Sequence, residues 1–422
     1  MRKVIIFLLT IICTTTVFAS RKEILLNNNW MFRYSWQVQK NSEERVDLPH
    51  TWNAQDALSG KQDYYRGIGN YRKILPISND LKGKRIYIRF EGANTVANLF
   101  INQKHVGEHR GGYGAFVFDI SEYVEFGKDN EILVRVNNAQ QLDVMPLVGD
   151  FNFYGGIYRD VYLIITEEEH ISLTDYASPG VYLIQNNVTK ESANLSAKVM
   201  LNNFSEIKTA TISVNILDGN KNIISKSSSI ELIKGENISH TIDFTINNPR
   251  LWNSIKDPFM FRSEITLMVN GEEKDKVAHM EDITRPTVAA SFLGDDNPLN
   301  QHSDLIAWNK YYGWYGGGFE QMGSWADGFH KRFPQYKLGV SEYGAGASIY
   351  HQQEELKVTD PTSWWHPENW QTAYHEGNWK AINERKFIWG SFIWNLFDFG
   401  AAHRTEGDRP GINDKGLVTF DR

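Results

Sequence analysis

One glutamate in the C-terminal third of the chain stands where a barrel enzyme would place a catalytic acid. Residues 337–341 form a short apolar run typical of a buried parallel strand. Glu342, Tyr343 and Gly344 follow at once. In α/β barrels the catalytic carboxylates lie at the C-terminal ends of the strands. An acid at a strand end can instead cap the next helix, so the motif by itself leaves both interpretations open.

A second group of chemically capable residues lies near the C-terminus. An apolar run over residues 387–394 predicts another buried parallel strand, and a polar, turn-rich segment over residues 403–416 follows it. Polar loops beside an aromatic strand end are typical of sites that hold sugar hydroxyls. The candidate substrate-binding residues are Trp394, Asn395, Asp398, His403, Asn413 and Lys415.

These residues need a frame of strands and helices, and the sequence predicts only part of one. Residues 370–384 read as a helix between the two apolar strands, which is the β-then-α order of a (β/α)₈ barrel. Residues 283–422 are too few for a whole barrel, which takes about 250 residues. The expected third module is therefore the C-terminal half of a TIM barrel.

Two β regions precede this module. Alternating runs at residues 85–90 and 131–136, separated by Gly, Asn and Asp, predict a jelly roll. Runs at residues 210–216 and 263–269, the latter followed by the hairpin signal Asn270-Gly271, predict an immunoglobulin-like sandwich. The aromatic content of 13% suits the cores of such β domains and also the stacking of sugar rings.

The first nineteen residues have the order of a secretory signal peptide. Arg2 and Lys3 precede an apolar stretch, and residues 17–19 end in a small-residue cleavage pattern. The only cysteine, Cys13, lies inside this segment, so the exported protein would have no disulfide and no cysteine-bound metal. The protein is expected in the periplasm or outside the cell. The expected modules are a signal peptide (1–19), a jelly-roll sugar-binding-like domain (20–170), an immunoglobulin-like sandwich (171–277) and a partial TIM-barrel catalytic domain (278–422).

Several motifs together resemble glycoside hydrolase family 2, and especially its exported β-galactosidases. The motifs cover nearly all of the chain after the signal peptide. They are Leu48-Pro49-His50-Thr51-Trp52-Asn53, Gly69-Asn70-Tyr71-Arg72-Lys73, Tyr158-Arg159-Asp160-Val161, Pro249-Arg250-Leu251-Trp252, Thr284-Arg285-Pro286-Thr287 and the segments after Ser341 and Phe392.

This resemblance implies retaining hydrolysis of terminal β-galactosides. Glu342 would be the nucleophile, and Trp394 would stack on the sugar. A β-glucuronidase is the alternative, because Asn413-Asp414-Lys415 matches the Asn-x-Lys with which such enzymes hold the sugar carboxylate, and a Lys ammonium suits an anionic sugar. The surrounding residues 410–416 also look like those of galactosidase-type members, and we favour the galactoside at this point.

The chain also departs from the family pattern. Family members carry an Asn-Glu pair, whose Glu is the acid/base, in the first half of the barrel, and here residues 276–284 pass directly into later sequence. Asn383-Glu384 comes after the nucleophile, in the wrong order, and Glu281, Glu320 and Glu406 read as surface or loop acids. The catalytic acid/base is therefore not present, and a retaining glycosidase needs two carboxyl groups about 5–5.5 Å apart. A non-catalytic carbohydrate-binding protein or a defunct truncated product is the alternative from another class.

The expected partner is an oligosaccharide or β-galactoside. The net charge of −7 argues against nucleic acid, and no stretch after the signal peptide is apolar enough to span a membrane. No cofactor is required by the family chemistry. Carboxylates and His403 could hold a divalent cation, but no spacing demands one. The sequence does not indicate an oligomeric state.

Overall fold

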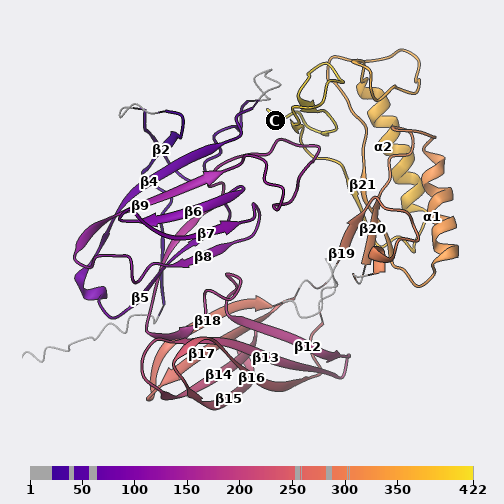
Figure 1. The fold of residues 1–422 in the computed structure, drawn as a ribbon. Helices are drawn as coiled ribbons and strands as arrows, with labels where there is room; N and C mark the ends of the chain where they lie inside the picture. Colours follow the sequence, from indigo (N-terminus) through magenta and orange to yellow (C-terminus); the bar gives the residue numbers. More distant parts are fainter. Residues whose placement is uncertain are drawn as a thin grey trace, which may run out of the picture.

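The computed structural model describes residues 21–37, 42–56, 64–251, 257, 259–281, 288–301, 303 and 305–421. The expected signal peptide and residues 284–287 of the family motif lie outside the described residues. Figure 1 shows two β sandwiches and a parallel sheet that carries two helices. No helix in the described ranges is long and apolar enough to cross a membrane.

The N-terminal sandwich packs a four-stranded sheet against a six-stranded sheet, as expected for the jelly roll. Its core forms because successive side chains of a strand point to opposite faces. Val134 and Val136 are fully buried, whereas Arg135 between them is exposed. The four-stranded sheet has the order β1 (Lys22–Leu25), β10 (Val161–Thr166), β5 (Arg85–Phe90) and β8 (Phe116–Asp119), and the other has the order β3 (Glu44–Val46), β2 (Trp30–Tyr34), β4 (Ile68–Ile77), β9 (Lys128–Asn137), β6 (Val96–Ile101) and β7 (Lys104–Arg110), with a short 3₁₀ turn η1 (Asn79–Leu81).

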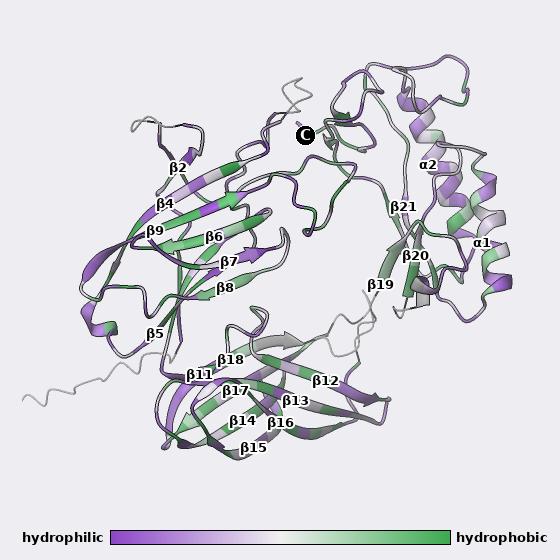
Figure 2. Ribbon diagram, viewed as in Figure 1, coloured by the Kyte–Doolittle hydropathy of each residue, from purple (hydrophilic) through white to green (hydrophobic). Residues whose placement is uncertain are grey.

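The second sandwich has two four-stranded antiparallel sheets around its own apolar core. Figure 2 shows hydrophobic and hydrophilic residues interleaved along its strands. Asn270 and Gly271 both have positive φ, which is what the predicted two-residue hairpin requires. One sheet contains β11 (Glu169–Ile171), β13 (Ser192–Asn203), β12 (Val181–Val188) and β16 (Gly235–Asn247), and the other has the order β15 (Lys221–Leu232), β14 (Lys208–Asp218), β17 (Phe261–Val269) and β18 (Glu272–Glu281).

Two strands of this sandwich lie across the expected module boundaries. β11 begins at Glu169 and pairs with β13, and β18 pairs with β17 up to Glu281. Residues 278–281, which were expected in the catalytic module, therefore lie in the last strand of the sandwich.

The C-terminal module is a parallel sheet in which the strand order follows the chain order. β19 (Val288–Ser291), β20 (Leu305–Asn309), β21 (Leu338–Tyr343) and β22 (Ser391–Ile393) pair in succession. A 3₁₀ turn η3 (Pro298–Gln301), helix α1 (Glu320–Arg332) and helix α2 (Glu368–Asn383) occupy the three connections. Four parallel strands with intervening helices are the arrangement expected of half a (β/α)₈ barrel.

The two outer strands of this sheet each have one edge without a neighbouring strand among the described residues. The sequence predicts a buried strand over residues 387–394, but β22 spans three residues, and Phe392 and Ile393 are 55% and 39% exposed. That prediction of burial is wrong. A continuous run of apolar residues is typical of a parallel strand that is buried on both faces. In the described chain, β22 lacks the further strands and helices of a barrel that would bury it.

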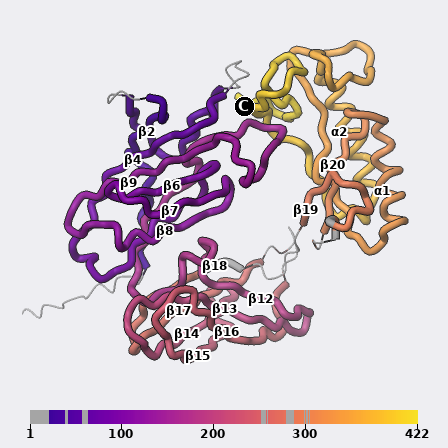
Figure 3. The backbone as a smooth tube through the Cα atoms, in the orientation of Figure 1, coloured from indigo at the N-terminus to yellow at the C-terminus, as the bar shows by residue number. Residues whose placement is uncertain are grey.

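The end of the chain returns to the N-terminal sandwich. Figure 3 shows the yellow C-terminal segment beside a loop of the first domain. The backbone N–H of Asn152 donates to the Gly400 carbonyl (2.9 Å), and the Asn152 side chain accepts from the Ala402 N–H (2.8 Å). A short ladder of β23 (Phe399–Gly400) and β24 (Ile412–Asn413) holds this segment together. Residues about 250 positions apart are thereby fixed in one structure.

Candidate active site

Strand β21 determines the direction in which Glu342 points. Adjacent strand residues face opposite sides of a sheet. Tyr343 is buried in the apolar cluster beneath α2, with Trp370 and Tyr374. Val340 belongs to the same cluster, so the register shift between Val340 and Tyr343 interrupts simple alternation at Glu342. The half-buried Glu342 side chain lies outside this cluster.

A tyrosine holds the Glu342 carboxylate. The Tyr311 hydroxyl, just after β20, donates a hydrogen bond of 2.7 Å to Oε2 of Glu342. Burial raises the pKa of Glu342, while hydrogen bonds from Tyr311 and Asn309 oppose that rise. Burial and the neighbouring Glu342 charge raise the pKa of Tyr311, so the phenol remains a proton-bearing donor. The Glu342 carboxylate is therefore held in place, and the two hydrogen bonds offset only part of the cost of burying its negative charge.

The first domain supplies a second carboxylate to the site. Asp150 accepts from Nε of Arg404 at 2.6 Å and also from Nη2 of the same guanidinium. The Asn413 side-chain amide donates to Asp150 at 2.9 Å, and Nε2 of His403 lies 3.1 Å from it. The Asp150 charge contributes to the raised pKa of Glu342, so the two carboxylates act on each other across the site.

Lys415, two residues after Asn413, is the buried cation of this site. It is 1% exposed, and its ammonium lies 5.4 Å from the ring centroid of Tyr315 and 5.8 Å from that of Trp314. Within the described part of the chain, no carboxylate lies within 4.0 Å of this ammonium. The Lys415 charge lowers the pKa of Glu342, which places the two groups in one electrostatic environment. A buried cation without an anionic partner is costly unless a ligand supplies the anion.

A buried histidine fixes the loop that carries Asn413 and Lys415. Nδ1 of His366 lies 2.5 Å from the Asp414 carboxylate, and the two residues are 0% and 3% exposed. The Gln371 side chain on α2 donates to the carbonyl of Gly416 at 3.1 Å. The segment before α2 and α2 itself thus hold the Lys415 loop in place.

The predicted residues at the end of β22 have structural partners. Trp394 follows β22, and its N–H donates to the Tyr343 carbonyl at 2.9 Å. The Asn395 N–H donates to the Lys415 carbonyl at 3.1 Å. The Asp398 carboxylate accepts from Arg409 (2.6 Å) and from the Gly416 N–H (2.8 Å). Asp398 and Asn395 therefore join this segment to the Lys415 loop.

The remaining acids considered for proton transfer are occupied or exposed. Glu406 pairs with Arg404, and Glu320 is exposed in the first turn of α1. Glu384 is exposed beyond the end of α2. The ranges described by the structure contain no group of three or more His, Cys, Asp or Glu side chains placed to hold a metal ion.

Sequence reasoning missed several residues of this site. Tyr311, Trp314 and Tyr315 belong to an aromatic run with glycine, Tyr311-Tyr312-Gly313-Trp314-Tyr315-Gly316, that directly follows the apolar strand β20. That position was a usable signal, because loops after barrel strands form the active site. Arg404 lies within the predicted polar segment 403–416, whereas Asp150 carried no such signal, since it meets that segment only through the fold.

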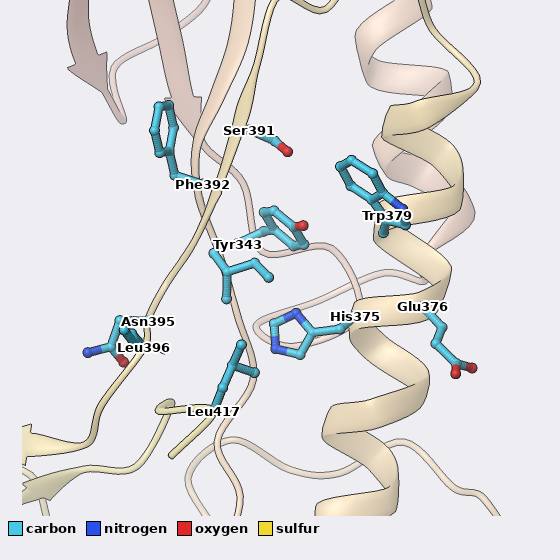
Figure 4. A pocket seen from close by; sticks show the side chains of 10 residues that line it. Tyr343, His375, Glu376, Trp379, Ser391, Phe392, Asn395, Leu396 and Leu417 are labelled. Atoms are coloured by element: carbon cyan, nitrogen blue, oxygen red, sulfur yellow. The ribbon is translucent and has the colours of Figure 1, made fainter. Parts of the chain in front are cut away.

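A separate apolar hollow lies on the other side of β21 and β22. Its volume is about 690 Å³, and α2 forms one wall. Figure 4 shows Tyr343, His375, Trp379, Leu396 and Leu417 around it. Burial lowers the pKa of His375 to about 4, so this side chain is neutral. The hollow contains neither Glu342 nor Lys415 and is a different feature from the polar site.

The chain is similar to known proteins in both sequence and fold. Residues 26–167 match the family model "Glycosyl hydrolases family 2, sugar binding domain", and residues 181–280 match the model "Glycosyl hydrolases family 2". A β-glucuronidase of Bacteroides fragilis is 42% identical, over 99% of this chain and 82% of the relative. A putative β-glucuronidase of Formosa agariphila is 33% identical over 62% of this chain and 31% of its own length. A crystal structure of a putative β-galactosidase from B. fragilis has a TM-score of 0.87 at 26% identity, over 96% of this chain and 84% of that one.

These matches place the chain in the O-glycosyl hydrolase class of enzymes. The chain belongs to glycoside hydrolase family 2, whose members are O-glycosyl hydrolases. The alignment with the B. fragilis β-glucuronidase is 570 residues long, whereas this chain has 422 residues, so part of the relative has no counterpart here.

Proposed function

We propose that the site binds the terminal sugar of a β-glucuronide, with Glu342 as the nucleophile of a retaining hydrolysis. The observation that carries the proposal is Lys415, a buried ammonium without a carboxylate partner in the described chain, beside Asn413. The carboxylate of glucuronate would supply the missing negative charge through a charge-assisted hydrogen bond. The neutral C6 hydroxymethyl group of galactose would leave the charge uncompensated.

The relatives support the same order of preference. The B. fragilis relative at 42% identity is named a β-glucuronidase, while the similar structure described as a putative β-galactosidase is 26% identical. The galactoside favoured from sequence thus becomes the second candidate. Its support is the name given to that B. fragilis structure and the resemblance of residues 410–416 to galactosidase-type members.

Hydrolysis by this site would proceed in two displacements. The Glu342 carboxylate attacks the anomeric carbon, and the bond to the leaving oxygen breaks as that oxygen takes a proton. Water then attacks the glycosyl ester and releases Glu342. The proton donor is the weak point, because Asp150 and Glu406 are both occupied by Arg404. General acid–base help is worth about 10²–10⁴-fold, so we propose that the 422-residue chain binds the sugar but turns over natural glycosides near the background rate.

The proposal is tested by comparing the rates at which two substrates that differ only in the sugar are hydrolysed. The missing barrel segment of a close relative would be inserted after Glu281, and 4-nitrophenyl β-D-glucuronide and β-D-galactoside would be compared with both chains. We expect the restored chain to prefer the glucuronide and to lose turnover in the Glu342→Gln variant, because an amide cannot attack the anomeric carbon. Preference for the galactoside would refute the assignment. Rapid hydrolysis of an unactivated glycoside by the 422-residue chain would refute its incompleteness.

Export is part of the same proposal. The charged, apolar and small-residue order of residues 1–19 supports secretion with cleavage just before Ser20. N-terminal sequencing of the exported protein should begin at or near Ser20. An intact Met1 on the exported protein would refute cleavage.

A further inference from the structure

The six-stranded sheet of the N-terminal sandwich carries a hollow on its outer face, far along the chain from Glu342. The volume of the hollow is about 390 Å³, and it lies across β4, β6, β7 and β9, which run side by side in Figure 1. Its lining includes Val96, Asn98, Phe100, Arg135, Asn137 and Gln141.

Strand alternation explains why these side chains face outward. Leu99 and Ile101 of β6 and Val134 and Val136 of β9 are buried in the sandwich core. Their neighbours must therefore point to the opposite face. The register places Asn98 directly beside Arg135 on the adjacent strand. A row of polar side chains thus runs across the sheet, with half-buried Phe100 in the next row.

Two positive and two negative side chains surround the hollow, and they are not paired evenly. Arg110 is neutralised, because it donates to Asp143 at 2.7 and 2.9 Å and to Glu108 at 3.0 Å. Glu108 in turn accepts from Asn98 at 2.9 Å. Arg135 has no carboxylate within 4.0 Å in the described chain, so its exposed guanidinium is the one of these four charged groups without an ion pair. This guanidinium presents a planar fork of donors suited to a carboxylate.

We propose that this hollow is a second, non-catalytic saccharide site and that its ligand is a sugar bearing a carboxylate, such as a uronic acid unit of an oligosaccharide. Arg135 pairs with the carboxylate in two parallel hydrogen bonds. Amide side chains of Asn137 and Gln141 face the hydroxyls, and Phe100 offers an apolar surface to the C–H face of the ring. The family model describes this domain as sugar binding, without naming a face or a ligand. The proposal does not depend on Glu342 or on a complete barrel.

Calorimetric titration of the whole chain with D-glucuronate tests this site. Binding at the candidate active site and binding at the hollow can be removed separately, by substituting Lys415 and Arg135. The Lys415→Met variant removes the cation of the candidate active site and should retain one glucuronate site. Adding Arg135→Gln should weaken that remaining site about tenfold or more, as expected for loss of a charged hydrogen bond. Arg135→Lys, which keeps the charge without the fork, should give an intermediate affinity. Arg45→Gln is the matched control, since Arg45 is an exposed arginine of β3 in the same sheet and outside the hollow.

Two further probes define the ligand class. The neutral methyl ester of glucuronic acid should bind at least tenfold more weakly than glucuronate, and inorganic phosphate should not displace glucuronate at equal concentration. Unchanged binding in the Arg135→Gln, Lys415→Met chain would overturn the proposal, as would equal competition by phosphate. If Lys415→Met leaves both glucuronate sites intact, the proposed function of the candidate active site fails while the second site stands.

Discussion

Replacing Lys415 by methionine shows whether its charge serves to bind a ligand or to stabilise the fold. Methionine has a similar length and keeps the apolar contact with Trp314 and Tyr315 but removes the charge. A hydrogen bond to a charged group is worth about 1.5–3 kcal/mol. The dissociation constant for glucuronate at this site should therefore rise about ten- to a hundredfold, while that for neutral galactose should change little.

The same substitution should not destabilise the fold. Replacing buried ions by apolar side chains is neutral or stabilises by about 1–4 kcal/mol. The lost interaction of the ammonium with the two aromatic rings is worth about 0.5–2 kcal/mol in the other direction. Taken at the middle of both ranges, the free energy of unfolding should rise by about 1 kcal/mol.

Calorimetric titration with both sugars and denaturation in urea measure the two effects. Lys386→Met is the control, because Lys386 is exposed just beyond α2. Equal loss of glucuronate and galactose binding would indicate a collapsed loop rather than a lost charge. A clear drop in stability with unchanged glucuronate affinity would refute the reasoning, because Lys415 would then be a structural cation.

Three further outcomes are expected. Burial raises the pKa of Glu342 above 4.5, so the ionised carboxylate destabilises the folded chain and Glu342→Gln should stabilise it at neutral pH. Urea denaturation should show that this gain in the free energy of unfolding shrinks as the pH falls through the raised pKa and is absent below pH 4.5. Asp150→Asn leaves Glu406 as the carboxylate partner of Arg404 in the described chain and should lower the stability of the C-terminal module by about 1–2 kcal/mol. This value is already reduced because Asp150 is 38% exposed, and calorimetric scanning that shows no shift would contradict it. Residues 20–281, which keep β18 whole, should be soluble and unfold cooperatively when expressed alone. The whole chain should associate through its open sheet edges in size-exclusion chromatography, and a monomeric whole chain that unfolds as one unit would contradict this.

Local patterns predicted the β regions well, because each depends on neighbouring residues. The run at residues 131–136 lies within β9, and the helix expected at residues 370–384 is α2 (Glu368–Asn383). Alternation and hairpin residues act over a few positions, so sequence alone suffices for them. The burial of β22 was not predictable in this way, because it depends on strands that the described chain does not contain.

The candidate site was predictable only in the part that follows strand ends. Glu342 and the Lys415 loop follow apolar runs and could be found by position. Asp150 lies in a loop of another module, and nothing near it in the sequence refers to Arg404 or Asn413, which lie more than 250 residues later. Contacts of this kind arise from the docking of modules and have no local pattern.

The contact of Asp150 and Asn152 with the C-terminal segment limits how this protein can be recombined. A chimera that exchanges the first sandwich for another jelly roll would also remove the carboxylate on Arg404 and the backbone partner of Gly400. The incoming domain would have to bring an acidic residue two positions before an asparagine in the same loop. In a recombination library, crossovers that keep residues 150–152 with residues 400–415 should therefore survive selection, and those that separate the two segments should be lost.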